Sequence, residues 1–184
     1  MDREAAARAI DAFLRALGRD PDREPELSGT GARVADAFAD DLLEGYDVDI
    51  DALLRANLLA GSGEIVAVRD LAVTTMCPHH LMPATGTATV AFAPHEHLVG
   101  VGTIGRLVDV FAHRLALQEG IGEQVVAALE KHLAPRWVGC RLVLSHACMT
   151  ARGERKHGAR VETVALAGGD LDRRVAYRAL GVGQ

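Results

Sequence analysis

The chain has 184 residues, a net charge of −5 and a pI of about 5.9. Its length favours one main domain, with room for a substantial core. Hydrophobic residues make up 49% and charged residues 24%, as in ordinary globular proteins. Nothing in this acidic balance suggests a nucleic-acid partner, which usually needs a concentrated basic surface, although a local basic pocket can still bind an anionic substrate. No apolar run is long enough to span a bilayer, so no membrane partner is expected.

The N-terminal residues and the cysteines indicate the compartment. The first residues, MDREAAARAIDAFLRAL, are charged from the start and lack the apolar centre of a signal peptide. Three cysteines are an odd number, which favours free thiols used for metal binding or chemistry over a disulfide framework. We therefore expect a cytoplasmic protein.

The first third of the chain reads as helical. Ile10, Phe13 and Leu14 share the face of a helix that ends near Gly18. A linker over residues 19–26 and further helices over 30–45 and 49–60 follow. Residues 1–60 are predicted to form an N-terminal helical region, and residues 61–184 a separate domain.

The pattern changes to strands after residue 60. Residues 64–73 are rich in β-branched side chains, and residues 85–92 alternate with period two. Two amphipathic helices are predicted next, the first ending near Gly120 and the second over residues 121–133. Alternation over 138–145 and a β-branched run over 161–166 complete a ββααββ order. This order predicts an α+β fold with an antiparallel sheet and two helices on one face, and open sheet edges suggest an oligomer.

Two polar clusters are candidates for chemistry. Cys77 and His80 are three residues apart, so a single turn can direct a thiolate and an imidazole at one point. His146 and Cys148 end the third strand and, two apart, are predicted to project to one face. Thiolate and imidazole ligands suit zinc, and three protein ligands with one open position are typical of catalytic zinc. The alternative is inert buried cysteines beside satisfied histidines, and core packing is the better interpretation of Cys140.

Other polar residues suggest a ligand. Glu119, after Gln118 at a predicted helix end, has the acceptor geometry for two adjacent N–H donors, such as those of guanine, although a solvated helix end is the more common case. Arginine matches phosphate geometry through its planar guanidinium. Candidate anion contacts are Arg106, Arg152, Arg155, Lys156 and Arg160, although each alone is more often ordinary surface charge.

Three separated segments carry a family resemblance. MCPHH, HLVGVGTIGRLVDVFAHRLALQEGI and SHACMTARG resemble, in order and approximate spacing, the motifs of GTP cyclohydrolase I. The similarity covers residues 68–169, and more weakly reaches back to Arg33. The resemblance implies a tunnelling-fold catalytic domain over residues 61–184, assembled as a homodecamer with active sites between subunits. It also implies hydrolysis of GTP to 7,8-dihydroneopterin triphosphate and formate, in pteridine and tetrahydrofolate biosynthesis.

The resemblance also implies roles for individual residues. By the family pattern, Zn²⁺ is held by Cys77, His80 and Cys148 and activates a water for attack on C8 of guanine. His146 corresponds to the acid that protonates the opening ring, and His79 to a second proton-transfer group near the ribose. Substrate contacts correspond to Gln118, Glu119, Arg106, Arg152 and Arg33.

This chain departs from the family pattern at three main positions. Pro78 stands where glutamate is common, and Gly102 and Thr103 replace a Ser-Lys pair before the helix. The losses remove a hydroxyl associated with the sugar rearrangement and a positive charge at the triphosphate, although Thr103 offers a hydroxyl one position along. Gly31, near Arg33, stands where proline is usual.

Three functions remain open from the sequence. The first is a zinc-dependent GTP cyclohydrolase. The second is a divergent paralogue that opens the ring of a related purine or stops before the sugar rearrangement. The third is a non-catalytic zinc-containing oligomer, which would not need His79, His146, Gln118 and Glu119. A tunnelling-fold nitrile reductase fits less well, because a thiol committed to zinc is not free as a nucleophile.

Overall fold

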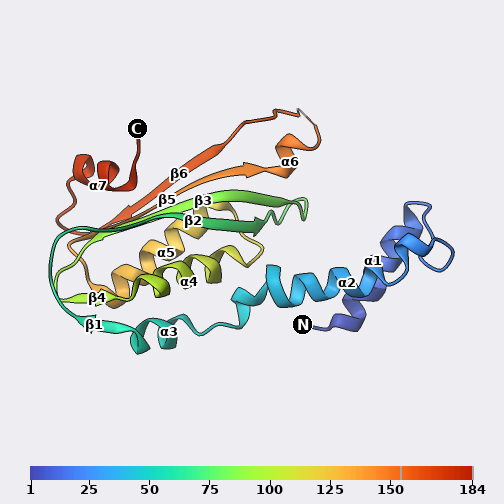
Figure 1. The fold of residues 1–184 in the computed structure, drawn as a ribbon, viewed down its shortest axis with the longest axis horizontal. Coiled ribbons are helices and arrows are strands. Elements are labelled where there is room, and N and C mark those ends of the chain that lie inside the picture. The colour runs from blue at the N-terminus through green and yellow to red at the C-terminus, as the bar shows by residue number, and fades with distance from the viewer. Residues whose placement is uncertain (154, 184) are drawn as a thin grey trace. The chain divides into compact units, whose positions relative to one another are not determined.

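The computed structural model describes residues 1–153 and 155–183, which divide into two compact units, Met1–Glu44 and Gly45–Gln184. Figure 1 shows the helices of the first unit and the sheet of the second. No described helix has both the length and the apolar character needed to cross a membrane.

The first unit is a pair of helices, α1 (Arg3–Ala16) and α2 (Thr30–Ala37), joined through the 3₁₀ turn η1 (Pro25–Leu27). Asp2 caps α1 by accepting a hydrogen bond from the Ala5 N–H. A Cβ at Gly31 would lie 2.5 Å from the Ala7 carbonyl oxygen. The departure at position 31 therefore has a local cause, since only glycine permits this approach of the two helices.

The predicted helix over residues 30–45 is wrong in its second half. After α2 the chain makes a π-helical turn, η2 (Phe38–Leu42), and then a 3₁₀ turn, η3 (Glu44–Asp47). The Gly45 N–H donates to the His113 carbonyl, and a Cβ at Gly45 would lie 2.1 Å from the Val110 carbonyl oxygen. Gly45 is therefore held by a tertiary contact that a continuous α-helix would not make.

The second unit is built on a four-stranded antiparallel sheet with strand order β2-β3-β5-β6. The strands are β2 (Val66–Met76), β3 (Pro83–Ala93), β5 (Trp137–His146) and β6 (Val161–Ala167). Helices α4 (Val101–Ala112) and α5 (Gln118–Leu133) cover one face (Figure 1). The predicted ββααββ order and α+β class are confirmed.

The main core lies between the sheet and these two helices. Its strand residues are those predicted from alternation, because period two directs every second side chain to the helices. They include Ala88, Val90 and Phe92 on β3 and Val138, Cys140, Leu142 and Leu144 on β5. The helices contribute Ile104, Leu107, Val108 and Phe111 from α4 and Ile121, Val125, Leu129 and Leu133 from α5.

Two further elements differ from the sequence prediction. The predicted helix over residues 49–60 ends early, as α3 (Ile50–Ala56), because β1 (Leu58–Ala60) pairs antiparallel with β4 (His97–Val99). The unpredicted helix α7 (Arg173–Leu180) packs Ala176 and Leu180 against Trp137 on the opposite sheet face.

The first central helix was predicted to end near Gly120, and this is wrong. Helix α4 ends at Ala112, and Leu115 pairs with Met76 of β2 in an isolated parallel bridge. Gln118 and Glu119 therefore begin α5 rather than end α4. This places both side chains at the same end of the sheet as the turn that follows Met76.

Candidate active site

The candidate metal ligands come from two chain segments that meet beside β3. Cys77 and His80 lie in the turn between β2 and β3, where the Cys77 carbonyl accepts from the Leu81 N–H at 2.9 Å. Cys148 lies in the short helix α6 (Ala147–Thr150) directly after β5. Cys148 was predicted to continue the strand, and this is wrong because β5 ends at His146. The pairing of His146 with Ala84 brings α6 to the turn.

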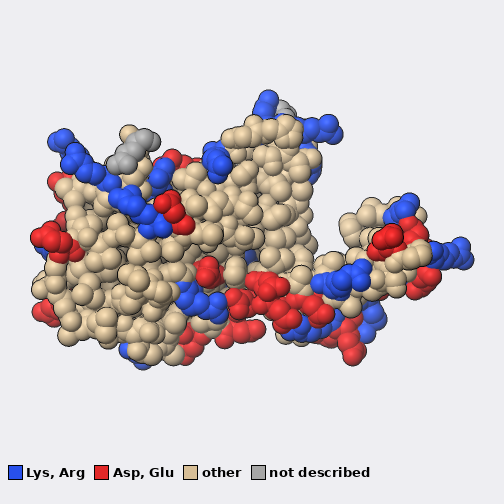
Figure 2. Space-filling model, viewed as in Figure 1, with Lys and Arg blue, Asp and Glu red and all other residues tan. Residues whose placement is uncertain are grey.

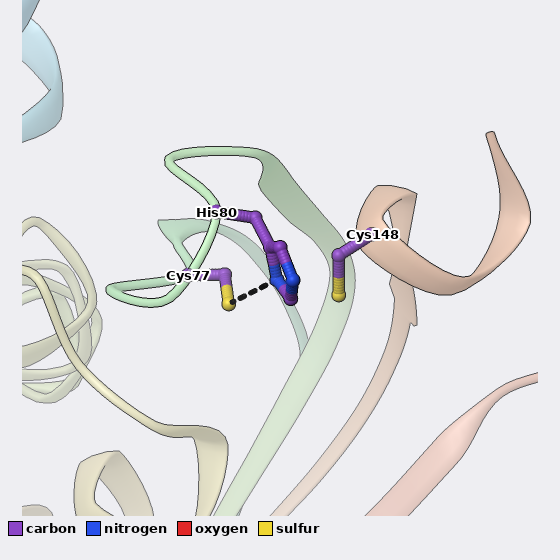
Figure 3. A group of neighbouring side chains, drawn as sticks. All are labelled: Cys77, His80 and Cys148. Carbon is purple, nitrogen blue, oxygen red and sulfur yellow. Dashed lines mark hydrogen bonds between the residues drawn. The ribbon is translucent and has the colours of Figure 1, made fainter. Parts of the chain in front are cut away.

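The three side chains converge, as Figure 3 shows. Their possible ligand atoms all lie within 4.8 Å of one another, and the Cys77 Sγ is 3.9 Å from the His80 Nδ1. Ligand atoms around tetrahedral zinc lie about 3.5–3.8 Å apart, given metal–ligand distances of about 2.0–2.3 Å. Small side-chain rotations are therefore enough to fit one ion. Two thiols and an imidazole are a donor set for zinc.

The environment of Cys148 disfavours its thiolate when no cation is near. Partial burial, and next the neighbouring Cys77, raise the pKa of the Cys148 thiol, while Arg152 acts in the opposite direction. A thiol must lose its proton to bind a metal, so binding releases protons. A divalent cation bound here would favour the thiolate form of Cys148.

A cavity of about 220 Å³ adjoins the two cysteines. It contains both candidate acid–base histidines, His79 and His146, and both residues expected to recognise guanine, Gln118 and Glu119. The remaining described lining residues are Thr75, Ala84, Ala116, Leu117 and Val161. All four predicted catalytic and base-recognition residues therefore line one cavity, beside the candidate metal ligands.

Hydrogen bonds fix the orientation of the Gln118 amide. Its Nε2 donates to the carbonyls of Leu142 (3.1 Å) and Val161 (3.0 Å), which accept only, and lies 3.1 Å from the Thr163 Oγ1. The Gln118 Oε1 must therefore face the His146 Nε2, at 2.7 Å. Because an amide oxygen only accepts, the His146 Nε2 must be the donor. The Nδ1 of neutral His146 is left as the nitrogen without a proton.

The predicted phosphate contacts are less concentrated. Thr103 is buried in the first turn of α4, and Arg106 follows on the same helix. Arg33 belongs to the first unit and bonds locally to the Ser28 carbonyl and the Thr30 hydroxyl. The described lining of the cavity includes neither these three residues nor Arg152.

Basic side chains also gather on the loop between α6 and β6, visible in Figure 2. This loop carries Arg152, Arg155, Lys156 and Arg160 in the sequence. It begins a few residues after Cys148, so positive charge lies on the same chain segment as one candidate metal ligand. The arrangement favours an anionic group near the cavity.

Sequence reasoning missed Thr75 as a lining residue. A signal for it existed, because residues two apart on a strand share a face and Thr75 precedes Cys77 by two. Its partner across the sheet is Ala84, which in turn pairs with His146. Thr75, Ala84 and His146 thus form one row across three strands.

Together the fold and the site define a class of protein. An α+β domain carries a Cys-His-Cys group beside a cavity lined by two histidines and a carboxylate, an arrangement typical of an enzyme active site that uses acid–base groups and can hold a metal ion.

Comparisons with known proteins identify the family. The family model for GTP cyclohydrolase I matches residues 6–179. GTP cyclohydrolase 1 of Bartonella henselae is 40% identical over 90% of this chain and 80% of its own length. The protein of that name from Leptospira biflexa is 38% identical over 86% of both chains. This chain belongs to the GTP cyclohydrolase I family and is an enzyme.

A solved structure was also found to be similar. It is described as the archaeosine synthase QueF-Like in the apo form, and it aligns with a TM-score of 0.48 and 18% identity. The alignment covers 59% of this chain and 98% of that one.

Proposed function

We propose that this enzyme hydrolyses the guanine imidazole ring of GTP in a zinc-dependent reaction, giving 7,8-dihydroneopterin triphosphate and formate. The observation that carries the proposal is the convergence of Cys77, His80 and Cys148 beside a cavity lined by His79, His146 and Glu119. Membership of the GTP cyclohydrolase I family supports the same substrate.

Zinc is proposed as the metal because two thiols and an imidazole match its ligand preference. When bound, it supplies a Lewis acid and a water molecule whose pKa is lowered to about 7. A fourth protein ligand would close the site. The described residues offer only this group of three convergent metal-binding side chains, which leaves a position for water.

The histidines are proposed as proton-transfer groups. His146 keeps its Nε2 proton in the bond to Gln118, so its Nδ1 is the position that takes up and delivers the exchanged proton. His79 also lines the cavity, is exposed, and serves the later proton transfers at the ribose. Both roles need groups that change protonation near neutral pH, as imidazole does.

Substrate recognition is divided among three groups of residues. The Glu119 carboxylate accepts from the N1–H and 2-amino groups of guanine. Gln118 is proposed to define this end of the cavity through its bond to His146. The triphosphate is assigned to Arg106, Arg152 and Thr103, the basic loop after α6 adding charge. For Arg33, in the first unit, a triphosphate contact is proposed from the family resemblance alone.

A second candidate function stops short of the pterin. Gly102 and Thr103 replace the family's Ser-Lys pair, while the proposed zinc and ring-opening residues are retained. A Cβ at Gly102 would have no heavy atom of the described residues within 4 Å, so no packing seen there explains the missing serine. A divergent enzyme of this kind would open the ring of GTP or a related purine and release the product before the sugar rearranges.

Assembly is proposed as a homo-oligomer, with ten subunits by family resemblance, in the cytoplasm. Strands β2 and β6 are the outer members of the four-stranded sheet, and such edges are commonly covered by another subunit. Native mass spectrometry tests this: ten chains of 19.5 kDa sum to about 195 kDa, and a monomer would contradict it.

One experiment separates the candidate functions. Zinc-loaded enzyme is incubated with GTP, GMP and guanosine, and every product is identified by mass. Formate with the complete pterin from GTP supports the first proposal. Formate with a ring-opened, unrearranged product supports the second, and G102S/T103K enzyme should then gain pterin formation. Zinc-loaded protein that releases no formate from any of the three would overturn both.

A further inference from the structure

Thr75 carries a buried hydroxyl for which the fold gives no use. The residue is 2% exposed, near the end of β2. Its Oγ1 has no hydrogen-bond partner among residues 1–153 and 155–183. The same residue lines the cavity beside the candidate metal ligands. A buried polar group of this kind reduces stability unless something hydrogen-bonds to it.

The row across the sheet places this hydroxyl relative to His146. Thr75 pairs with Ala84, and Ala84 pairs with His146. Directly paired residues project to the same face, so both side chains lie on the cavity side of the sheet. Neighbouring strands are about 4.8 Å apart, so the two backbones are separated by about 10 Å. That spacing leaves room for a flat bicyclic base between them.

Two other side-chain donors of the cavity, buried Gln118 and half-buried His146, are already in use. The Gln118 amide nitrogen is committed to the carbonyls of Leu142 and Val161, and the His146 Nε2 proton to the Gln118 oxygen. Glu119, when ionised, only accepts. His79 is exposed, whereas Thr75 is buried. Among the described residues that line the cavity, Thr75 is therefore the buried side-chain donor that remains for a ligand.

Guanine presents one acceptor next to the donors that Glu119 is proposed to bind. The edge runs from the 2-amino group to N1–H and then to the oxygen on C6, which needs a donor. We propose that the Thr75 hydroxyl donates a hydrogen bond to this exocyclic oxygen and so helps to select a 6-oxopurine. The inference rests on the proposed function and names a recognition residue for it.

The test compares two substitutions and two substrates. Thr75→Val keeps the shape and removes the hydroxyl, and Thr75→Ser keeps the hydroxyl. The substrates are GTP and 6-thioguanosine triphosphate, whose sulfur is a weak acceptor. Thr75→Val is expected to raise KM for GTP about three- to tenfold but change that for the thio analogue less than twofold. Thr75→Ser should remain near wild type with both.

A matched control removes a buried hydroxyl elsewhere. Thr89 is also buried, on β3, and is not among the residues lining the cavity. Thr89→Val should leave KM unchanged for both substrates. Because the Thr75 hydroxyl has no described protein partner, Thr75→Val should have a Tm equal to or above that of wild type. A purely structural role would instead lower its Tm.

Several outcomes overturn the inference. An unchanged KM for GTP in Thr75→Val, or an equal rise in KM with both substrates, would contradict a hydrogen bond from Thr75 to the exocyclic oxygen. If Thr75→Val does not fold, Thr75→Ala is compared with Thr75→Ser in the same way. If wild-type enzyme releases no formate, the proposed function fails. Equilibrium binding of GTP and its thio analogue to the same variants then decides the Thr75 contact separately.

Discussion

Cys140 and Cys148 lie close in sequence but in opposite environments. Cys140 is in the middle of β5, fully buried in the apolar core, and burial raises its pKa to about 12. Cys148 follows the end of the same strand and is only partly buried, with Cys77, His80 and Arg152 around it. The Cys140 thiol fills space in the core, and the Cys148 thiol lies in the group proposed to bind a metal ion.

The difference shows how one strand serves two purposes. Along β5, Leu142 and Leu144 continue the core, and His146, on the same face, lines the cavity. The apolar core gives way to the polar residues of the cavity at Gln118, where helix α5, which covers this face of the sheet, begins. The packed part of the sheet thus holds the strand register that brings His146 and Cys148 to the turn of Cys77.

The largest expected effect comes from substituting Cys148, with a substitution of Cys140 for comparison. Cys148→Ser should abolish tight zinc binding and lower formate release by more than about 100-fold, since even indirect supports of a metal cost 10–100-fold. Cys140→Ala should keep zinc and activity, and lose about 1–2 kcal/mol of stability through a small cavity. Metal analysis after dialysis, formate assay and denaturant unfolding measure these. Equal zinc loss in both variants would erase the distinction.

A substitution in the core tests the environment of Cys140. Leu142→Ala removes a fully buried side chain and should reduce the free energy of unfolding by about 2–5 kcal/mol. Because the core then opens more often, Cys140 should react faster with a thiol reagent. Unfolding in urea and timed labelling are the measurements. Exposed Leu59→Ala is the control, and comparable destabilisation in the control would contradict the assignment of the core.

The hydrogen bond between Gln118 and His146 lies where the apolar core of the sheet meets the cavity. Gln118→Leu removes the acceptor for the His146 Nε2, so His146 is no longer held in position. Because a positioned acid contributes a large part of the rate, kcat should fall about 10–100-fold. The carbonyls of Leu142 and Val161 also lose their donor, and stability should fall by about 1–3 kcal/mol.

Thr163→Val serves as the control for Gln118→Leu. It removes one neighbour of the Gln118 amide and keeps the bond to His146, so kcat should stay within about twofold. An equal loss of kcat in both variants would show that His146 does not depend on Gln118 for its orientation.

The smallest expected effect lies far from the cavity. Hydrogen bonds from Lys131, and then His132, lower the pKa of Asp51 to about 2. A carboxyl group whose pKa is lower in the folded state stabilises the fold at pH values above its unfolded-state pKa, near 4. This stabilisation is lost as the pH falls through the folded-state pKa, about 2. Asp51→Asn should therefore lower Tm by about 1–2 °C at pH 7 and converge with wild type below pH 2. A pH-independent difference would contradict this linkage.

Periodicity predicted the part of the fold that depends on local pattern. The alternation of β3 and β5 gave their inward faces, and those faces form the core. The three-residue strands β1 and β4 are too short to show a period, so their pairing was missed. The break between α4 and α5 was predicted too late in the chain, near Gly120, because the bridge of Leu115 to Met76 is a tertiary contact.

The site was predictable in its residue types and less so in its contacts. Spacing and family resemblance singled out Cys77, His80 and Cys148 as candidate metal ligands. The pairing of Ala84 with His146 brings the two segments that carry them together. The bond of Gln118 to His146 depends on where α5 starts, which the sequence pattern misplaced. Thr75 looks like any strand threonine until the cavity is seen.

X-ray absorption at the zinc edge of the loaded, substrate-free enzyme tests the central claim most directly. The account predicts two sulfur ligands at about 2.3 Å and two nitrogen or oxygen ligands at about 2.0–2.1 Å, with one sulfur lost in Cys148→Ser and none lost in Cys140→Ser. A zinc site with fewer than two sulfurs, or one unchanged by Cys148→Ser, would contradict it.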